Sequence, residues 1–328
     1  MFTIARTGLR LPLIALAAGL SGALVTTAQG TEAWPERPVT LVVPYGPGAS
    51  NDTFTRALAD ILSDKLGQPF VVENRAGAGG FTGSKSVADA DPDGYTFLEV
   101  PNSVVGFEPL MKVDLNPQTD LKPVGLLARA PTAMLVPASL GVDTVAEFIE
   151  HARQNPDSTF YGAAGIGTTQ QQHAELFNKA TGLKLLPVNY KSSADAQTDL
   201  IAGRLQVMFV TVASTLGQIQ SGQLKLLAYA DDNYPATAPD APTLADEGVM
   251  GMDVAQIFWS VWAPADTPDA IVMTMNGAIN EALEDENYAA LMAKSGATPA
   301  PSTPQDLTEV IVGERQLVDG FLQLGLME

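Results

Sequence analysis

The chain has 328 residues, of which 37 are Asp or Glu and 18 are Lys or Arg, so its formal net charge is −19 at pH 7. Nucleic acid and anionic membrane surfaces repel such a protein and are poor candidates for partners. The sequence contains no cysteine, so we expect no disulfide, no thiolate metal site and no lipoprotein anchor. The length suits two domains of ordinary size.

The first thirty residues have the layout of a secretory signal peptide. Arg6 and Arg10 precede an apolar run over residues 11–25, and small residues follow it. The alternative is a membrane anchor, but the run is shorter than the roughly 20 apolar residues of a spanning helix, and glycine and serine interrupt it. We therefore expect an exported protein whose signal is cleaved between Ala28 and Ala33.

Residues 39–66 run from a predicted strand through a glycine-rich turn into an amphipathic helix. Gly46 and Gly48 leave little side chain between the backbone of the turn and a ligand. The helix start offers three good N-cap residues, Ser50, Asn51 and Asp52. Unpaired N–H groups and the helix dipole favour a carboxylate or phosphate there, although an ordinary strand–helix turn can have the same residues.

A second strand, a second glycine turn and a short helix are expected across residues 70–90. The glycines at 77–80 match no phosphate-binding spacing, and we interpret them as close backbone packing near the site. Residues 95–100 predict a strand, and Asn102 and Ser103 follow its end, where α/β proteins place ligand contacts. The proline-punctuated segment 108–123 is predicted to be a long covering loop.

The middle of the chain alternates between strands and helices, which predicts a second, parallel α/β unit. The expected strands are 159–162, 184–188, 206–210 and 225–229, and the helices between them are 168–181, 194–202 and 213–220. The first of these strands again runs into a turn of small residues, 163–167, before Thr168 and Thr169 at a helix start. Two helix N-termini that favour anions suggest a ligand held between two domains.

The last third of the chain contains a proline-rich linker, an aromatic strand over 256–262 and three helices over 270–322. These helices are expected to pack on the first unit, which makes that domain discontinuous. The predicted domains are 34–127 with 245–328, and 128–244. The aromatic residues Phe258, Trp259 and Trp262 are typical of a core more than of a ligand platform.

With these segments laid out, the sequence resembles the extracytoplasmic solute receptors of tripartite tricarboxylate transporters, the Bug or TctC receptor family. The resemblance covers nearly the whole mature chain. Its motifs include WPERPVTLVVPYGPGASND, LGQPFVVENRAGAGG, DPDGYTFL, YGAAGIGTT, VNYKSSADAQTDLIAGRLQVMF and FWSVWAPADTP. The resemblance implies the type II periplasmic-binding-protein fold, in which two α/β domains hold a small carboxylate in the cleft between them.

Carried over residue by residue, the resemblance implies a site built from both turns. The first turn contributes Tyr45, Gly48, Ala49, Ser50, Asn51 and Asp52, and the second contributes Ala164, Gly165, Gly167, Thr168 and Thr169. Further expected contacts are Asn102, Ser103, Tyr190, Val210, Thr211 and Phe258. The sequence departs from the family at four places: Gly46, Ala49, Gln171 where histidine is frequent, and Val210–Thr211 where aspartate is frequent. Loss of that acid favours a plain carboxylate over an amino acid, whose ammonium would need it.

The function expected from these features is capture of a di-, tri- or aromatic carboxylate by a monomeric periplasmic protein, which delivers it to the large and small membrane subunits of a tripartite transporter. We expect no cofactor and no metal. An exported enzyme is the alternative from another class, but catalytic motifs are absent and the only histidines are His151 and His173. A sensor that presents its closed form to a signalling partner is a third possibility.

Overall fold

The computed structural model describes most of the chain from Trp34 onward. The described residues are 1–3, 34–48, 50–106, 109–110, 112–165, 168–190, 192–231, 234, 238–252, 257–323 and 325. Apart from residues 1–3, the predicted signal segment and its cleavage window therefore lie outside the described residues, and so do Ala49 and Gly167. Residues 1–34 and 35–328 are two separate units, and the fold is formed by the second.

A six-stranded mixed sheet organises what we call the first lobe, which consists of this sheet with α1, α2, α9, α10 and α11. In spatial order the strands are β11 (Thr298–Pro299), β4 (Leu121–Ala130), β10 (Ile257–Pro264), β3 (Thr96–Pro101), β1 (Val39–Val43) and β2 (Phe70–Asn74). β1 is parallel to β2 and β3, whereas β10 is antiparallel to both β3 and β4. A strand from late in the chain thus lies in the middle of a sheet begun near its start.

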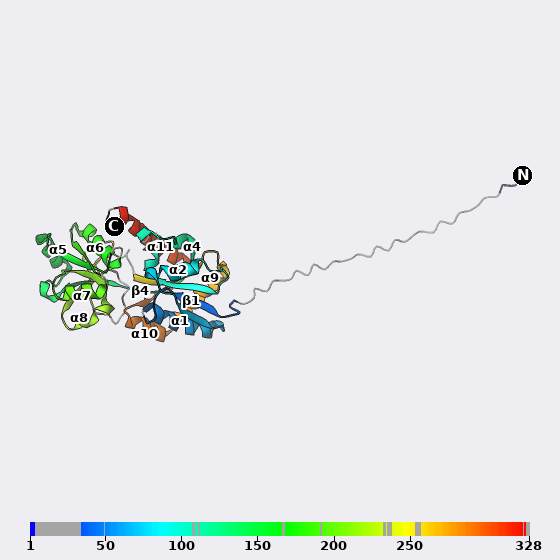
Figure 1. Ribbon diagram of the computed structural model, residues 1–328, viewed down its shortest axis with the longest axis horizontal. Helices are drawn as coiled ribbons and strands as arrows, with labels where there is room; N and C mark the ends of the chain where they lie inside the picture. Colours follow the sequence, from blue (N-terminus) through cyan, green and yellow to red (C-terminus); the bar gives the residue numbers. More distant parts are fainter. Residues whose placement is uncertain are drawn as a thin grey trace. The chain divides into compact units, whose positions relative to one another are not determined.

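Helices cover this sheet because each presents an apolar face to it. They are α1 (Ser50–Leu66), α2 (Phe81–Ala88), α9 (Asp269–Ala282), α10 (Glu286–Lys294) and α11 (Pro304–Gln323). On α1, Phe54, Leu58 and Leu62 have no exposed surface, as their helical spacing predicts. As expected from the sequence, α9 and α10 pack against α1, and α11 packs against β4 (Figure 1).

The second lobe consists of residues 132–230 and contains a three-stranded and a two-stranded sheet. Its strands are β5 (Thr132–Pro137), β6 (Phe160–Ala163), β7 (Leu186–Asn189), β8 (Met208–Thr211) and β9 (Leu224–Tyr229), and its helices are α5 (Val145–Gln154), α6 (Thr169–Thr181), α7 (Ser193–Ile201) and α8 (Leu216–Gln220). The four strands from which a parallel unit was predicted do run in one direction: β6 is parallel to β7, a parallel bridge joins Tyr161 to Val207, and β8 and β9 are both antiparallel to β5. The unit is not parallel throughout, because β5, which was not among those strands, lies between β8 and β9.

The predicted covering loop is also partly wrong. β4 begins at Leu121, and a short helix, α4 (Pro117–Asp120), precedes it with Asn116 as its N-cap. Strand pairing with β10 extends β4 beyond what its apolar residues suggest. Asn102 and Ser103 lie in a 3₁₀ helix, η2 (Asn102–Gly106), directly after β3.

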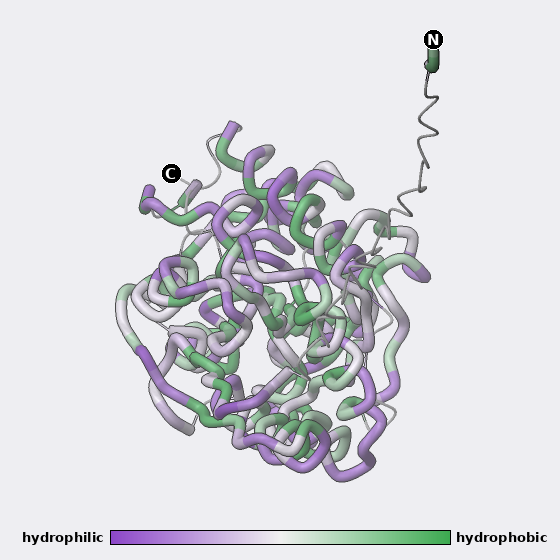
Figure 2. The backbone as a smooth tube through the Cα atoms, turned by 90° about the vertical axis from the view of Figure 1, so that its right-hand side faces the viewer, coloured by the Kyte–Doolittle hydropathy of each residue, from purple (hydrophilic) through white to green (hydrophobic). Residues whose placement is uncertain are grey.

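Many of the hydrophobic stretches of the backbone lie inside the fold (Figure 2), and the buried side chains of the described residues are mostly apolar. One buried cluster lies around Leu98, Phe258 and Trp262 in the first lobe, and another lies around Phe177 and Phe209 in the second. The second cluster includes Phe321 near the end of α11, so the last helix contributes to both lobes. In the part of the chain that the structure describes, none of the helices combines the length and apolar character needed to cross a membrane.

Asn276 on α9 ties three separate segments of the first lobe together. Its Nδ2 donates to the carbonyl oxygens of Val124 and Ser302, each at 2.8 Å, and the side chain is buried. We expect Asn276→Ala to lower the free energy of unfolding by about 1–3 kcal/mol, because the Val124 carbonyl loses this donor and the Ser302 carbonyl keeps only the one from Asn280. Thr274→Ala, at an exposed position of the same helix, is the control and should change it by no more than about 0.5 kcal/mol. Urea denaturation of both variants measures the difference, and equal stabilities would contradict the role of Asn276.

Candidate functional site

The first turn, residues 44–49, connects β1 to α1 and is held by the carboxylate of Asp52. The Gly48 N–H donates to Asp52 Oδ2 at 3.0 Å, and Arg56 Nε donates to the same oxygen at 3.0 Å. Asn74 Nδ2 donates to Oδ1 at 2.9 Å. The hydrogen bond from Arg56, with those from Gly48 and Asn74 and the charge of the guanidinium, lowers the pKa of Asp52 to about 2, although burial acts in the opposite direction. Asp52, predicted as a ligand contact, has its oxygens occupied and shapes the turn.

Tyr45 lies between the first turn and the second glycine turn. Its hydroxyl donates to the Gly79 carbonyl at 3.2 Å and lies 2.8 Å from Ser103 Oγ. A Cβ added at Gly80 would lie 2.8 Å from the Tyr45 hydroxyl oxygen, so only glycine fits there. The close approach at Gly80 agrees with the interpretation of the glycines at 77–80 as close packing, and Tyr45 and Ser103 lie together.

Glu99 is a residue that the sequence reasoning missed. It lies on β3, is 1% exposed, and accepts hydrogen bonds from Asn51 Nδ2 at 3.2 and 3.3 Å to its two carboxyl oxygens. Burial raises the pKa of Glu99 to about 8, and the charge of Asp52 adds to this while Asn51 and Thr55 oppose it. The available signal was an acid inside the apolar strand sequence TFLEVP.

The second turn leads from β6 into α6. Gly165 has φ 117°, a conformation that favours glycine, and Thr168 Oγ1 donates to the Gly165 carbonyl at 2.9 Å. The Ala164 N–H donates to Gln170 Oε1 at 2.7 Å, so the helix supplies an internal acceptor for it. Across the lobes, Asn102 Nδ2 donates to Thr169 Oγ1 at 3.1 Å. The end of β3 and the start of α6, predicted separately, are therefore in direct contact.

A cavity of about 480 Å³ opens beside the start of α6. Its lining is Thr132, Thr169, Gln170, Ser193, Ala194, Gln197, Phe209, Val210, Thr211, Ser214 and Ile257. Gln170 Nε2 donates to Ser193 Oγ at 2.8 Å, and Gln197 Nε2 donates to Ser193 Oγ and Ser214 Oγ at 3.2 and 3.3 Å. The described lining has no charged side chain, so a ligand would meet amides, hydroxyls and apolar groups. These glutamines and serines were not predicted, because their spacing in the sequence carries no motif.

Val210 and Thr211 line this cavity as expected, whereas two other predicted contacts lie elsewhere. Tyr190 is not among the lining residues, and its hydroxyl donates to Asp199 Oδ2 at 2.8 Å. Phe258 has no exposed surface and packs with Trp262 in the first-lobe core, so here it offers no surface to a ligand. β10 is an inner strand of the sheet, which directs the Phe258 side chain into the core, and the neighbouring Ile257 lines the cavity instead.

A larger hollow of about 590 Å³ lies between β4, β11 and the start of α11, and Arg129, Asp306 and Glu309 are among its lining residues. None of the predicted site residues is among its lining residues.

Among the described residues, no group of three or more His, Asp or Glu side chains is arranged to hold a metal ion. His173 is fully buried, its Nδ1 lies 2.9 Å from the Thr169 carbonyl, and burial lowers its pKa to about 4, which leaves the ring neutral at pH 7.

Comparison with known proteins gives one consistent family. A sequence profile described as the tripartite tricarboxylate transporter family receptor, TctC, matches residues 54–321. Protein BugT of Bordetella pertussis is 32% identical over 295 residues, which cover 89% of this chain and 90% of BugT.

Solved structures agree with this. The periplasmic binding protein BugD is 30% identical with a TM-score of 0.67, covering 90% of this chain and 99% of BugD. An R. palustris protein with adipate is 33% identical with a TM-score of 0.70, covering 88% of this chain and 97% of that protein. The fold is thus that of periplasmic binding proteins with two α/β domains.

We expect Asp52→Asn to lower the free energy of unfolding at pH 7, because it removes the negative charge that pairs with Arg56. The expected loss is only about 1–2 kcal/mol, since Arg56 is half exposed and solvent screens the ion pair. The pKa of Asp52 is lower in the folded than in the unfolded protein. Its contribution is therefore complete above about pH 4 and is lost as the pH falls toward 2. Thermal or urea unfolding of wild type and variant at pH 7 and at pH 3 measures this. A difference that does not shrink at the lower pH would contradict the charge-based role of Asp52.

Proposed function

The chain belongs to the tripartite tricarboxylate transporter receptor family, and we propose that it captures a small carboxylate between its two helix-start turns and delivers it to the large and small membrane subunits of a tripartite transporter. As a member of this family it is a solute-binding protein and not an enzyme. The proposal includes a periplasmic location, a signal cleaved between Ala28 and Ala33, and a monomer with domains 34–127 with 245–328 and 128–244. Similarity to the periplasmic protein BugD supports the location.

The observation that carries the proposal is the contact between Asn102 and Thr169, which brings the polar end of β3 to the N-terminus of α6. The first-turn N–H groups of α1 and α6 have no acceptor within their own helices and favour a negative group. Gly48 and Ala164 already donate to Asp52 and Gln170, so they hold the turns and leave the helix starts, with Ser50, for the ligand.

The ligand class follows from charge and shape. A protein of net charge −19 repels a carboxylate at long range, so local donors in a recess must outweigh that repulsion. The cavity beside α6 supplies neutral donors and the apolar side chains of Phe209, Val210 and Ile257. Several charge-assisted hydrogen bonds of roughly 1.5–3 kcal/mol each, offset by the cost of association, are enough for micromolar binding. The adipate held by the similar R. palustris protein is consistent with this class.

The direct test uses the purified protein without its signal segment. Acetate, adipate, citrate and benzoate serve as mono-, di-, tricarboxylate and aromatic probes in a thermal-shift assay, followed by calorimetry. At least one of them should raise the melting temperature in a concentration-dependent way, because a ligand that binds only the folded state stabilises it. If none of the four does so, the proposed function is wrong.

Thr169→Val should weaken binding of the probe about tenfold, because it removes the hydroxyl at the start of α6 that meets Asn102 while keeping the side-chain shape. Thr181→Val is the matched control. Thr181 lies in the last turn of the same helix, where its hydroxyl donates to the Phe177 carbonyl. Calorimetry on both variants should show a larger dissociation constant for Thr169→Val and an unchanged one for Thr181→Val. Equal affinities would remove Thr169 from the site.

A further variant tests the effect of an aspartate at the position where the family often has one and this chain has Val210–Thr211. Thr211→Asp should lower the affinity for a carboxylate by at least tenfold, because it places a negative charge in a cavity whose described lining is uncharged. Thr211→Asn has nearly the same shape without the charge and should have a much smaller effect. If both variants bind the probe equally well, the cavity beside α6 is not where the carboxylate lies.

A further inference from the structure

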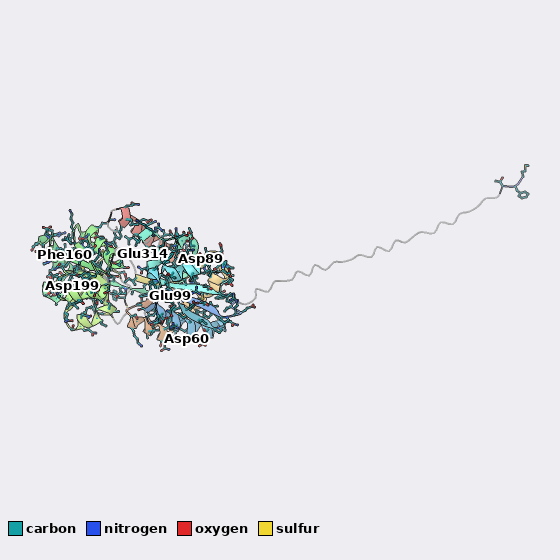
Figure 3. The ribbon with its side chains drawn as sticks, in the orientation of Figure 1. Asp60, Asp89, Glu99, Phe160, Asp199 and Glu314 are labelled. Atoms are coloured by element: carbon teal, nitrogen blue, oxygen red, sulfur yellow. The ribbon has the colours of Figure 1, made fainter. Side chains whose placement is uncertain are left out.

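Glu99 lies in the interior of the first lobe (Figure 3), in contact with Asn51 in the first turn of α1. The Asn51 side-chain amide makes this contact, with Nδ2 at 3.2 and 3.3 Å from the carboxyl oxygens of Glu99. Thr55, one turn further along α1, also contacts the carboxyl group, and its hydroxyl donates to the Asn51 carbonyl at 2.6 Å. We call the start of α1 at Ser50, where the ligand carboxylate is proposed to lie, the anion seat. Only the Asn51 side chain lies between the anion seat and the buried carboxyl group of Glu99.

The surroundings of Glu99 do not compensate a negative charge. The titratable groups that face it are Asp52, which is itself paired with Arg56, and the phenols of Tyr45 and Tyr288. The Tyr288 hydroxyl donates to the Phe54 carbonyl at 3.1 Å and is committed there. No described Lys, Arg or His forms an ion pair with Glu99. A carboxyl group without a cationic partner at 1% exposure retains its proton at pH 7, in line with its pKa of about 8.

We propose that Glu99 is a positioning residue for carboxylate binding, and that the receptor binds its ligand with Glu99 protonated, so that binding above neutral pH takes up one proton. This inference rests on the proposed function, because it needs the carboxylate to lie at the start of α1. No bond is made or broken other than the O–H bond of the Glu99 carboxyl group, whose proton comes from solvent.

The coupling follows from electrostatics and linkage. An ionised Glu99 would put a negative charge behind Asn51 and oppose the positive end of the α1 dipole, which is what favours the ligand. A bound carboxylate also makes it harder for Glu99 to ionise. By linkage, the factor by which ionisation of Glu99 weakens ligand binding equals the factor by which the ligand disfavours that ionisation. Ionisation would also change what Asn51 donates to, and with it the geometry of the first helical turn.

The sign of the pH dependence is fixed by this argument. Below about pH 8 Glu99 is protonated in the free and in the bound protein, so the affinity is constant. Above that pH the free protein loses the proton that the complex retains. The dissociation constant then rises with pH, at most tenfold per pH unit.

Calorimetry on the protein without its signal segment tests this with the tightest binder of acetate, adipate, citrate and benzoate. Between pH 7 and pH 9.5 the wild-type dissociation constant should rise about tenfold or more, and titrations at pH 9 in two buffers of different ionisation enthalpy should show uptake of up to one proton. Glu99→Gln should bind with a constant affinity over this range and take up none. Glu314→Gln, at a buried acid on α11, is the matched control and should behave like wild type.

A second measurement needs no ligand. Because the folded state holds the Glu99 proton more tightly than the unfolded state, wild-type stability should fall as the pH rises toward 8, relative to Glu99→Gln. Parallel melting-temperature curves for the two proteins between pH 5.5 and pH 9 would overturn the inference, whatever the ligand does.

The outcomes separate the two proposals. Carboxylate binding with no proton uptake and a flat affinity leaves the proposed function standing and overturns this inference. No binding of any probe at any pH overturns both. If Glu99→Gln does not fold, the proton count and the affinity profile of the wild-type protein still decide.

Discussion

The carboxylate of Asp52 fixes the position of the first turn, and the site depends on that turn. One side chain on α1 receives donors from the turn at Gly48, from its own helix at Arg56 and from the end of β2 at Asn74. Asn74 Nδ2 also donates to the Tyr45 carbonyl at 3.1 Å, so the strand next to β1 holds both ends of the turn. These bonds hold the turn in place directly before the first residues of α1.

The first and the second turn are held in position by different kinds of side chain. In the first lobe a carboxylate and a guanidinium hold the turn, whereas in the second lobe the Gln170 amide accepts from Ala164 and donates to Ser193. Neutral amides leave the cavity beside α6 without a charge among its described lining residues. In a protein with a large excess of acids, this arrangement keeps negative side chains away from the place where a second negative group would lie.

Much of the fold could be predicted from the sequence, because local patterns are strong where one helix or strand decides its own position. The apolar spacing on α1 and the N-cap residues Ser50 to Asp52 predicted the helix that the structure shows. The family resemblance was confirmed by the match over residues 54–321. The direction of β5 could not be read in this way, because it depends on how the chain passes from one lobe to the other.

The candidate site shows the same limit. Glycine and N-cap residues indicate where turns and helix starts lie in the sequence, so the turns at Gly48 and Gly165 and the helix start at Thr169 could be predicted. The hydrogen-bonded chain of Gln170, Ser193, Gln197 and Ser214 forms only where α6, α7 and the 3₁₀ helix Val212–Ser214 meet. The inward direction of Phe258 depends on β10 lying between β3 and β4. Whether a polar side chain binds a ligand or holds a turn is a property of its neighbours, as Asp52 and Tyr190 illustrate.

Asp52 and Glu99 lie on either side of Asn51 and carry the same functional group in opposite states. Asp52 is ionised because Arg56 neutralises it, and Glu99 is neutral because no cation reaches it and burial favours the protonated form. An anion seat next to two acids requires that neither presents a free negative charge. Arginine still neutralises Asp52 above neutral pH, whereas a proton neutralises Glu99 only up to the pKa of Glu99. If a carboxylate lies at the start of α1 as proposed, Glu99 is therefore the acid that sets the upper pH limit for its binding.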